Sequence, residues 1–80
     1  MAIKKGPKWG SVNSVKFALL CRKGNASRKP GATEEEVNDA ARLFEPETTL
    51  YSISSQVKYF EDHFAVKAVE TEPGRFYFGD

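Results

Sequence analysis

Two amphipathic stretches in tandem, within residues 33–64, constrain the fold of this 80-residue chain more than any other feature. The first opens on Thr-Glu-Glu-Glu, where Thr33 and Glu36 can each accept a hydrogen bond from the other's backbone amide. Three successive glutamates also suit the positive end of a helix dipole. Apolar residues recur at helical spacing as far as Phe44, and Pro46 disfavours helical backbone at the residue before it. The pattern therefore predicts a capped helix that ends before Pro46.

The second stretch predicts another helix with a single apolar face. We expect Thr48 or Thr49 to start it. Apolar residues then follow at alternating spacings of three and four, at Leu50, Ile53, Val57, Phe60 and Phe64. Two short helices with a tight polar connection are typical of a helix-turn-helix.

The preceding residues predict an arm, a helix and a loop. Residues 1–10 are expected to form a flexible basic arm, because glycines and a proline interrupt any regular structure. Ser11 or Ser14 can cap a helix that runs to Arg22, and its wide apolar sector should make it the most buried of the three helices. Residues 23–31 are rich in Gly, Asn, Ser and Pro, which favours a loop.

Short strands are predicted before and after the tandem helices. Residues 31–32 are expected to form a short strand that leads into the first helix cap. Residues 65–71 are rich in small and β-branched side chains, and residues 72–75 (Glu-Pro-Gly-Arg) suit a tight turn. The alternation that follows places Phe76 and Phe78 on one face of a second strand. This predicts a C-terminal β-hairpin that closes the core.

Charge is distributed unevenly along the chain. Residues 1–33 contain eight basic residues and no acid, which gives +8, whereas residues 34–80 contain four basic and eleven acidic residues, which gives −7. The sum is the net charge of +1. Such asymmetry indicates a basic face for a polyanion, two faces for two partners, or two halves that neutralise one another on folding.

The residue types argue against an enzyme, a metal site and a membrane protein. Cys21 is the only cysteine, which excludes an internal disulfide and a cysteine zinc site, so we expect it to be a small core residue. His63 has no evident partner for catalysis or metal binding. No apolar run approaches the roughly 18 residues of a membrane span, and no signal-peptide pattern is present. We expect no cofactor, no metal, and a cytoplasmic or nucleoid-associated location, or a nuclear one in a eukaryote.

The order of predicted elements resembles the winged helix-turn-helix superfamily over residues 12–78. The resemblance is carried by the entry into the second helix at residues 31–33, the apolar stripe of the third helix and the turn at residues 72–75. It implies an α+β fold, a small three-helix winged helix-turn-helix with a C-terminal β-hairpin, over residues 11–80. It also implies that the third helix enters the DNA major groove, while the hairpin, the wing, touches the backbone or minor groove.

The surface expected for double-stranded DNA has three parts: the resemblance implies the third helix and the wing, and the density of cations indicates the basic loop. The outward face of the third helix would contribute Tyr51, Ser52, Ser55, Lys58 and Tyr59. The basic loop would hold phosphates through Arg22, Lys23, Arg28 and Lys29. Arg75 would be the cation of the wing. The protein would then be a transcriptional regulator or accessory factor, with weak sequence specificity because Lys58 is the single basic residue on the recognition face.

Acidic residues beside the predicted recognition helix leave a second function open. The second helix begins with three glutamates, and Asp62 lies on the outward face of the third, where a carboxylate weakens binding to phosphates. The alternative is a protein-interaction module, for example a mobile-element or phage factor that binds and modulates a host protein. Its acidic helices, with Tyr51 and Tyr59, would meet a basic or mixed partner. In either case the chain could act as a homodimer.

Overall fold

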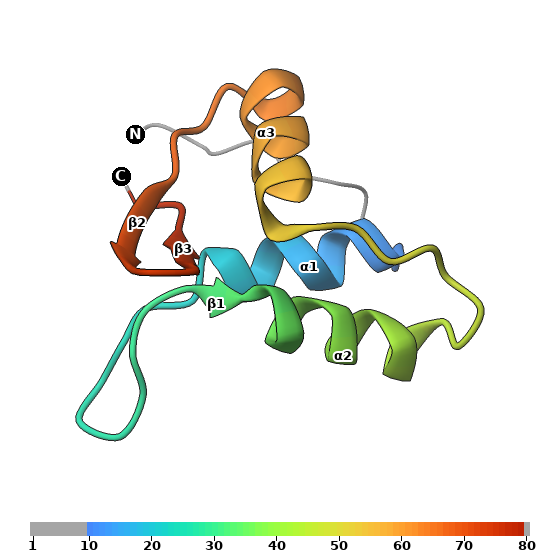
Figure 1. Ribbon diagram of the computed structural model, residues 1–80, viewed down its shortest axis with the longest axis horizontal. Helices are drawn as coiled ribbons and strands as arrows, with labels where there is room; N and C mark the ends of the chain where they lie inside the picture. The colour runs from blue at the N-terminus through green and yellow to red at the C-terminus, as the bar shows by residue number, and fades with distance from the viewer. Residues whose placement is uncertain (1–9, 80) are drawn as a thin grey trace.

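The computed structural model describes residues 10–79, which form three helices and a three-stranded antiparallel sheet (Figure 1). The elements follow in the order α1 (Val12–Leu20), β1 (Ala32–Thr33), α2 (Glu34–Phe44), α3 (Ile53–Phe64), β2 (Val69–Glu72) and β3 (Arg75–Tyr77). The predicted α+β architecture of three helices and a C-terminal hairpin is confirmed. The predicted arm, apart from Gly10, lies outside the described residues.

The strands pair in the order β1-β3-β2, so the short strand before α2 lies against the hairpin. Ala32 is opposite Phe76 in this pairing. Gly31, just before β1, has a φ of +76°, and a side-chain carbon there would lie 2.0 Å from the carbonyl oxygen of Phe76. Only glycine therefore fits where the chain enters the sheet.

The loop between α1 and β1 is closed by its own backbone. At its base, the amide of Gly31 donates to the carbonyl of Arg22 at 2.8 Å. Within it, Asn25 and Arg28 exchange backbone hydrogen bonds at 2.7 and 3.3 Å. Figure 1 shows this loop extending away from the helices.

Helices α1 and α2 begin where the sequence predicts. The side chain of Ser11, one of the two predicted caps, accepts from the amide of Ser14 at 3.2 Å. The hydroxyl of Thr33 accepts from the amide of Glu36 at 3.3 Å, while the Glu36 carboxylate accepts from the Thr33 amide at 2.9 Å. Both hydrogen bonds of the predicted capping box are present. Helix α1 ends at Leu20, two residues earlier than predicted.

Helix α3 begins later than predicted. Neither predicted threonine caps it, because its N-cap is Ser52, whose hydroxyl accepts from the amide of Ser55 at 3.3 Å. The carboxylate of Glu34, in the first turn of α2, accepts from the amide of Ile53 at 2.8 Å. Residues 45–52 form an irregular connection in place of a tight turn, and Leu50 is exposed within it. The predicted start of α3 and the core position of Leu50 are therefore wrong.

The core lies where α1 and α3 meet the C-terminal segment. The Phe17 ring centroid is 5.3 Å from that of Phe60 and 5.5 Å from that of Phe78. The predicted stripe of α3 is confirmed from its first residue onward, since Ile53, Val57 and Phe60 are all buried. Within residues 10–79, no helix is long and apolar enough to cross a membrane.

Candidate functional site

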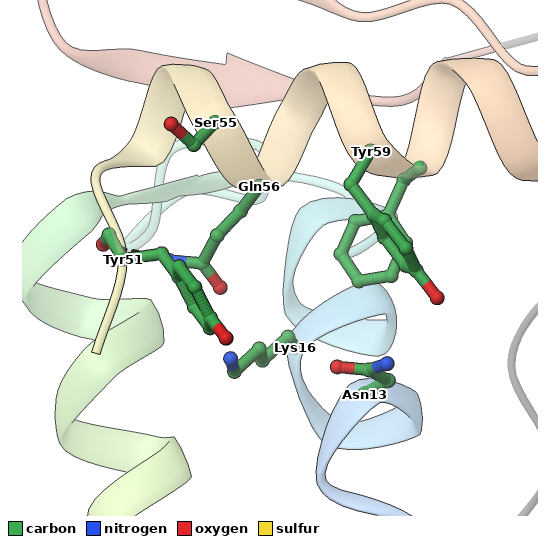
Figure 2. A pocket seen from close by; sticks show the side chains of 7 residues that line it. Asn13, Lys16, Tyr51, Ser55, Gln56 and Tyr59 are labelled. Atoms are coloured by element: carbon green, nitrogen blue, oxygen red, sulfur yellow. Dashed lines mark hydrogen bonds between the residues drawn. The ribbon is translucent and has the colours of Figure 1, made fainter. Parts of the chain in front are cut away.

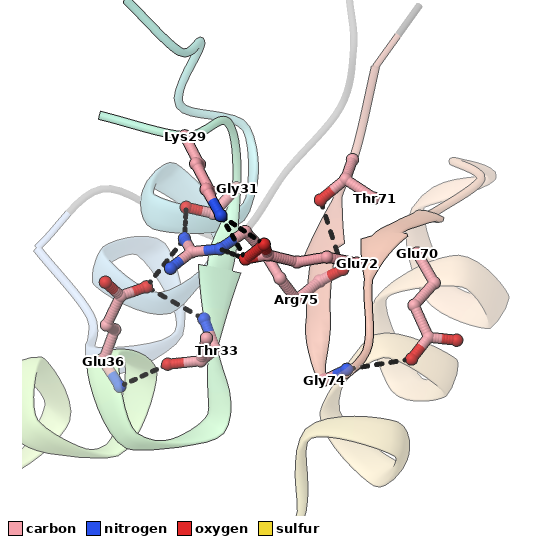
Figure 3. Close-up of polar contacts among 9 residues, drawn as sticks. All are labelled: Lys29, Gly31, Thr33, Glu36, Glu70, Thr71, Glu72, Gly74 and Arg75. Carbon is pink, nitrogen blue, oxygen red and sulfur yellow. Dashed lines mark hydrogen bonds and ion pairs between the residues drawn. The ribbon is translucent and has the colours of Figure 1, made fainter. Parts of the chain in front are cut away.

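Arg75 does not occupy the exposed position that the winged-helix resemblance implies. Its side chain is only 14% exposed, and its guanidinium pairs with Glu36 at 3.1 Å and with Glu72 at 3.3 Å (Figure 3). It also donates to the carbonyl of Gly31 at 3.5 Å. Because the two carboxylates already neutralise it, Arg75 ties α2 to the hairpin and is not a free cation of the wing.

The carboxylates of this network are held in their ionised form. At Glu36, burial raises the pKa, but hydrogen bonding from the backbone of Thr33 and the charge of Arg75 outweigh it, so the pKa lies below its usual value. A hydrogen bond from Lys29 is the main cause that lowers the pKa of Glu72, and Arg75 lowers it further. The network therefore stabilises the junction of α2, the loop and the hairpin at neutral pH.

Two more predicted DNA contacts have acidic partners. Lys29 pairs with Glu72 at 2.6 Å, and Lys58 pairs with Asp62 one helical turn later at 3.3 Å. Both pairs are exposed, so each is weak and a phosphate could compete for the lysine.

The remaining loop cations differ in exposure. Lys23 and Arg28 are exposed, and neither forms an ion pair with any residue that the structure describes. Arg28 donates to the carbonyl of Lys23 at 2.8 Å, whereas Arg22 is half-buried at the base of the loop. The loop therefore presents two cations without acidic partners.

The residues predicted on the third helix divide between the helix, its cap and the connection. Ser55, Lys58 and Tyr59 lie on α3 and are exposed, as predicted. Ser52 is the cap, and Tyr51 precedes the helix. The structure thus brings them to one end and one side of α3, with a single lysine among them.

Large exposed hydrophobic side chains come mainly from one stretch of the chain. Among residues 10–79, five of the six such residues lie within residues 43–59, and we call these five the apolar surface: Leu43, Phe44, Leu50, Tyr51 and Tyr59. Leu43 is 87% exposed. Helical spacing predicted Phe44 and Leu50 in core stripes, but both are exposed, and it gave no prediction for Leu43. A run of two large apolar residues at the end of a helix was the available signal.

A pocket of about 540 Å³ lies between α1 and α3 (Figure 2). Its walls are formed by Asn13, Lys16, Tyr51, Ser55, Gln56, Tyr59 and Phe60. Lys16 is 3% exposed, and its ammonium lies 5.1 Å from the centre of the Tyr51 ring. Gln56 is 5% exposed, and Figure 2 shows its side-chain oxygen directed into the pocket.

The sequence analysis did not identify Lys16 or Gln56 as site residues. The available signal was a polar residue one helical turn from a buried apolar one, since Lys16 is followed by Leu20 and Gln56 by Phe60. That pattern is common on exposed helix faces, so only the tertiary packing of α1 against α3 distinguishes these two.

Comparison of the chain with known protein families, curated proteins and solved structures gave no match. The winged-helix resemblance therefore stays a prediction from the order of elements. No group of His, Cys, Asp and Glu within residues 10–79 is arranged to hold a metal ion.

Proposed function

We propose that this protein is a protein-interaction module that binds its partner through the apolar surface. The observation that carries the proposal is the concentration of five large exposed hydrophobic side chains within residues 43–59. Large exposed apolar side chains that form a contiguous patch commonly mark an interaction site, and the proposal is that these five do so. Tyr51 and Tyr59 belong to the residue type that contributes most to binding hot spots, because a tyrosine offers a large contact area with a polar end.

The charge around the apolar surface defines the chemistry of the partner. Residues 34–51 contain six acidic residues and one basic residue, which gives −5. The single basic residue, Arg42, pairs with Asp39 on the same helix. A partner protein with an apolar centre and a rim of lysine or arginine side chains complements this surface.

Direct reading of DNA bases fits the same geometry less well. Arg75 is neutralised inside the protein, and Lys58 pairs with Asp62 on the face that would enter the groove. A second candidate function, non-specific binding of a nucleic-acid backbone, is favoured by the exposed Lys23 and Arg28 of the loop.

An NMR amide-shift titration with a mixed-sequence DNA duplex, at low and then at higher salt, separates these functions. The interaction module predicts no salt-sensitive shifts at residues 51–59. Shifts confined to the basic loop would establish the backbone-binding function alone. Shifts at residues 51–59 that fade with added salt would overturn the proposal in favour of DNA reading.

Affinity capture from the source cell tests the interaction directly. We expect a partner that is retained by the wild-type chain and lost with Leu43→Ser or Phe44→Ser. Val69→Ser is the matched control, because Val69 is the sixth exposed hydrophobic residue and lies on β2, outside the apolar surface. Equal capture by all four proteins would contradict a role for the apolar surface.

A further inference from the structure

We propose that the pocket between α1 and α3 is a binding site for a small organic anion that also carries an N–H or O–H donor. Two polar side chains that line the pocket carry this proposal, because neither the ammonium of Lys16 nor the side-chain oxygen of Gln56 has a hydrogen-bond partner among the described residues. It goes beyond the interaction function and does not depend on it.

The first unmet group is the ammonium of Lys16. Within residues 10–79 it forms no hydrogen bond and no ion pair, and its contact is the ring of Tyr51 at 5.1 Å. Burial lowers the pKa of Lys16, and attraction to Glu45 offsets this only in part. Buried charges in folded proteins are generally paired, because removal of an ion from water is unfavourable without a counter-ion. An anion in the pocket would supply the missing partner.

The second unmet group is the side-chain oxygen of Gln56. The amide nitrogen of the same side chain donates to the Asn38 side-chain oxygen at 3.2 Å and to the Tyr51 carbonyl at 3.1 Å. These two bonds fix the orientation of the amide, so its oxygen faces the pocket (Figure 2). That oxygen is buried and has no donor among the described residues. A buried acceptor without a donor is unusual in folded proteins, so we expect a bound molecule to supply the missing N–H or O–H donor.

The rest of the pocket suits a small molecule that bears both groups. Its volume of about 540 Å³ lies in the range of roughly 300–1,000 Å³ that is usual for such sites. Phe60 provides an apolar wall, and Tyr51 and Tyr59 line the same pocket. No carboxylate from the described residues lines the pocket.

Other occupants fit less well. A halide ion could pair with the ammonium of Lys16, but it has no hydrogen to donate to the oxygen of Gln56. It would also leave most of the pocket unfilled, because a particle of about the size of a water molecule takes only about 30 Å³. Residues 1–9 carry three lysines and no acid, so these side chains offer no anion to Lys16.

NMR titration of the full-length, nitrogen-15-labelled chain tests the proposal with two probes. N-acetylglycine and 4-hydroxybenzoate each combine a carboxylate with a donor, and the neutral amide of each is its control. We expect saturable shifts at the pocket residues with the acids, and binding at least tenfold weaker with the amides. Equal binding of acids and amides, or no saturable shift at millimolar concentrations, would overturn the proposal.

Two lysine substitutions locate the site. Lys16→Met removes the ammonium but keeps a long, flexible apolar side chain, so it should reduce binding of the acids at least tenfold. Lys23→Met is the matched control, because it removes the same charge from the exposed loop, and its binding should equal that of the wild type. Unchanged binding by Lys16→Met would refute the site, and the wild-type comparison of acid with amide stands even if that variant folds poorly.

Discussion

Replacing Lys16 by methionine should raise the free energy of unfolding of this protein. The residue is only 3% exposed, so its aliphatic part already contributes packing that methionine retains. What the substitution removes is the ammonium, which has no hydrogen-bond or ion-pair partner among the described residues. An ion that is fully removed from water without a counter-ion costs several kcal/mol, and the Lys16 ammonium, which is not among the side-chain atoms wholly shielded from solvent, bears part of that cost.

Two favourable terms reduce that penalty. The cation–π contact of the ammonium with the Tyr51 ring stabilises the folded protein by about 0.5–2 kcal/mol, and the charge of Glu45 also attracts the ammonium. The net gain for Lys16→Met should therefore be about 1–2 kcal/mol at neutral pH. In a domain of this length, 1 kcal/mol shifts Tm by about 4–8 °C, so Tm should rise by about 5–15 °C.

The pH dependence of this gain provides a specific test. Because burial lowers the Lys16 pKa from its ordinary value of 10.5, the unfolded chain binds more protons than the folded chain as pH approaches 10.5 from below. Wild-type stability should therefore rise through that window while the methionine variant lacks this term. Thermal denaturation followed by circular dichroism at pH 7 and near pH 10 measures both.

Lys23→Met is the matched control for the stability of Lys16→Met. Lys23→Met, in the exposed loop, should leave the free energy of unfolding within about 0.5 kcal/mol of the wild-type value. A Lys16→Met protein that melts lower than the wild type at pH 7 would show that the ammonium is stabilised, and the inference that its partner is missing would then fail.

Three further substitutions test the rest of the fold by chemical denaturation. Phe60→Ala should cost about 3–5 kcal/mol, because removal of a ring that contacts three other phenylalanines, in a residue that is 1% exposed, leaves a cavity; a smaller loss would contradict the assigned core. Ala65→Gly should stabilise by about 0.5–1 kcal/mol, since Ala65 ends α3 with a φ of 53°; a loss would mean that its methyl group contributes packing. Arg75→Ala should cost about 1–3 kcal/mol at pH 7. That difference should shrink as pH falls below 4.5, where Glu36 protonates through its lowered pKa, and a pH-independent loss would exclude the ion pair as its source.

Local signals in the sequence predicted the helices and the hairpin well. The capping box at Thr33 is confirmed because both of its hydrogen bonds join residues three apart, which sequence spacing specifies directly. The tight turn predicted at residues 72–75 is another local feature, and Gly74 has a positive φ there, of 83°. Such features depend on neighbours along the chain, so one sequence suffices to find them.

The features that the sequence did not predict depend on distant residues. The first turn of α3 is capped by Ser52 and also bonded to Glu34, nineteen residues earlier, whose carboxylate accepts from the Ile53 amide. Arg75 is turned inward by Glu36, thirty-nine positions away. The pocket exists only because Lys16 on α1 and Gln56 on α3 are packed together. The two members of each pair are far apart in the sequence, and no regular spacing links them. The pocket between α1 and α3 was therefore not predicted, although the helices and the hairpin were.

The backbone closure of the loop between α1 and β1 makes the protein a natural scaffold for inserted peptides. The bond from the Gly31 amide to the Arg22 carbonyl fixes the distance between the two ends of the loop, whatever lies between them. A foreign sequence, such as an epitope or a sensor peptide, could replace the exposed tip, with loss of the backbone hydrogen bonds between Asn25 and Arg28 and of the surface ion pair between Lys29 and Glu72. The helices and the sheet would hold the two ends of the inserted peptide at the positions of Arg22 and Gly31.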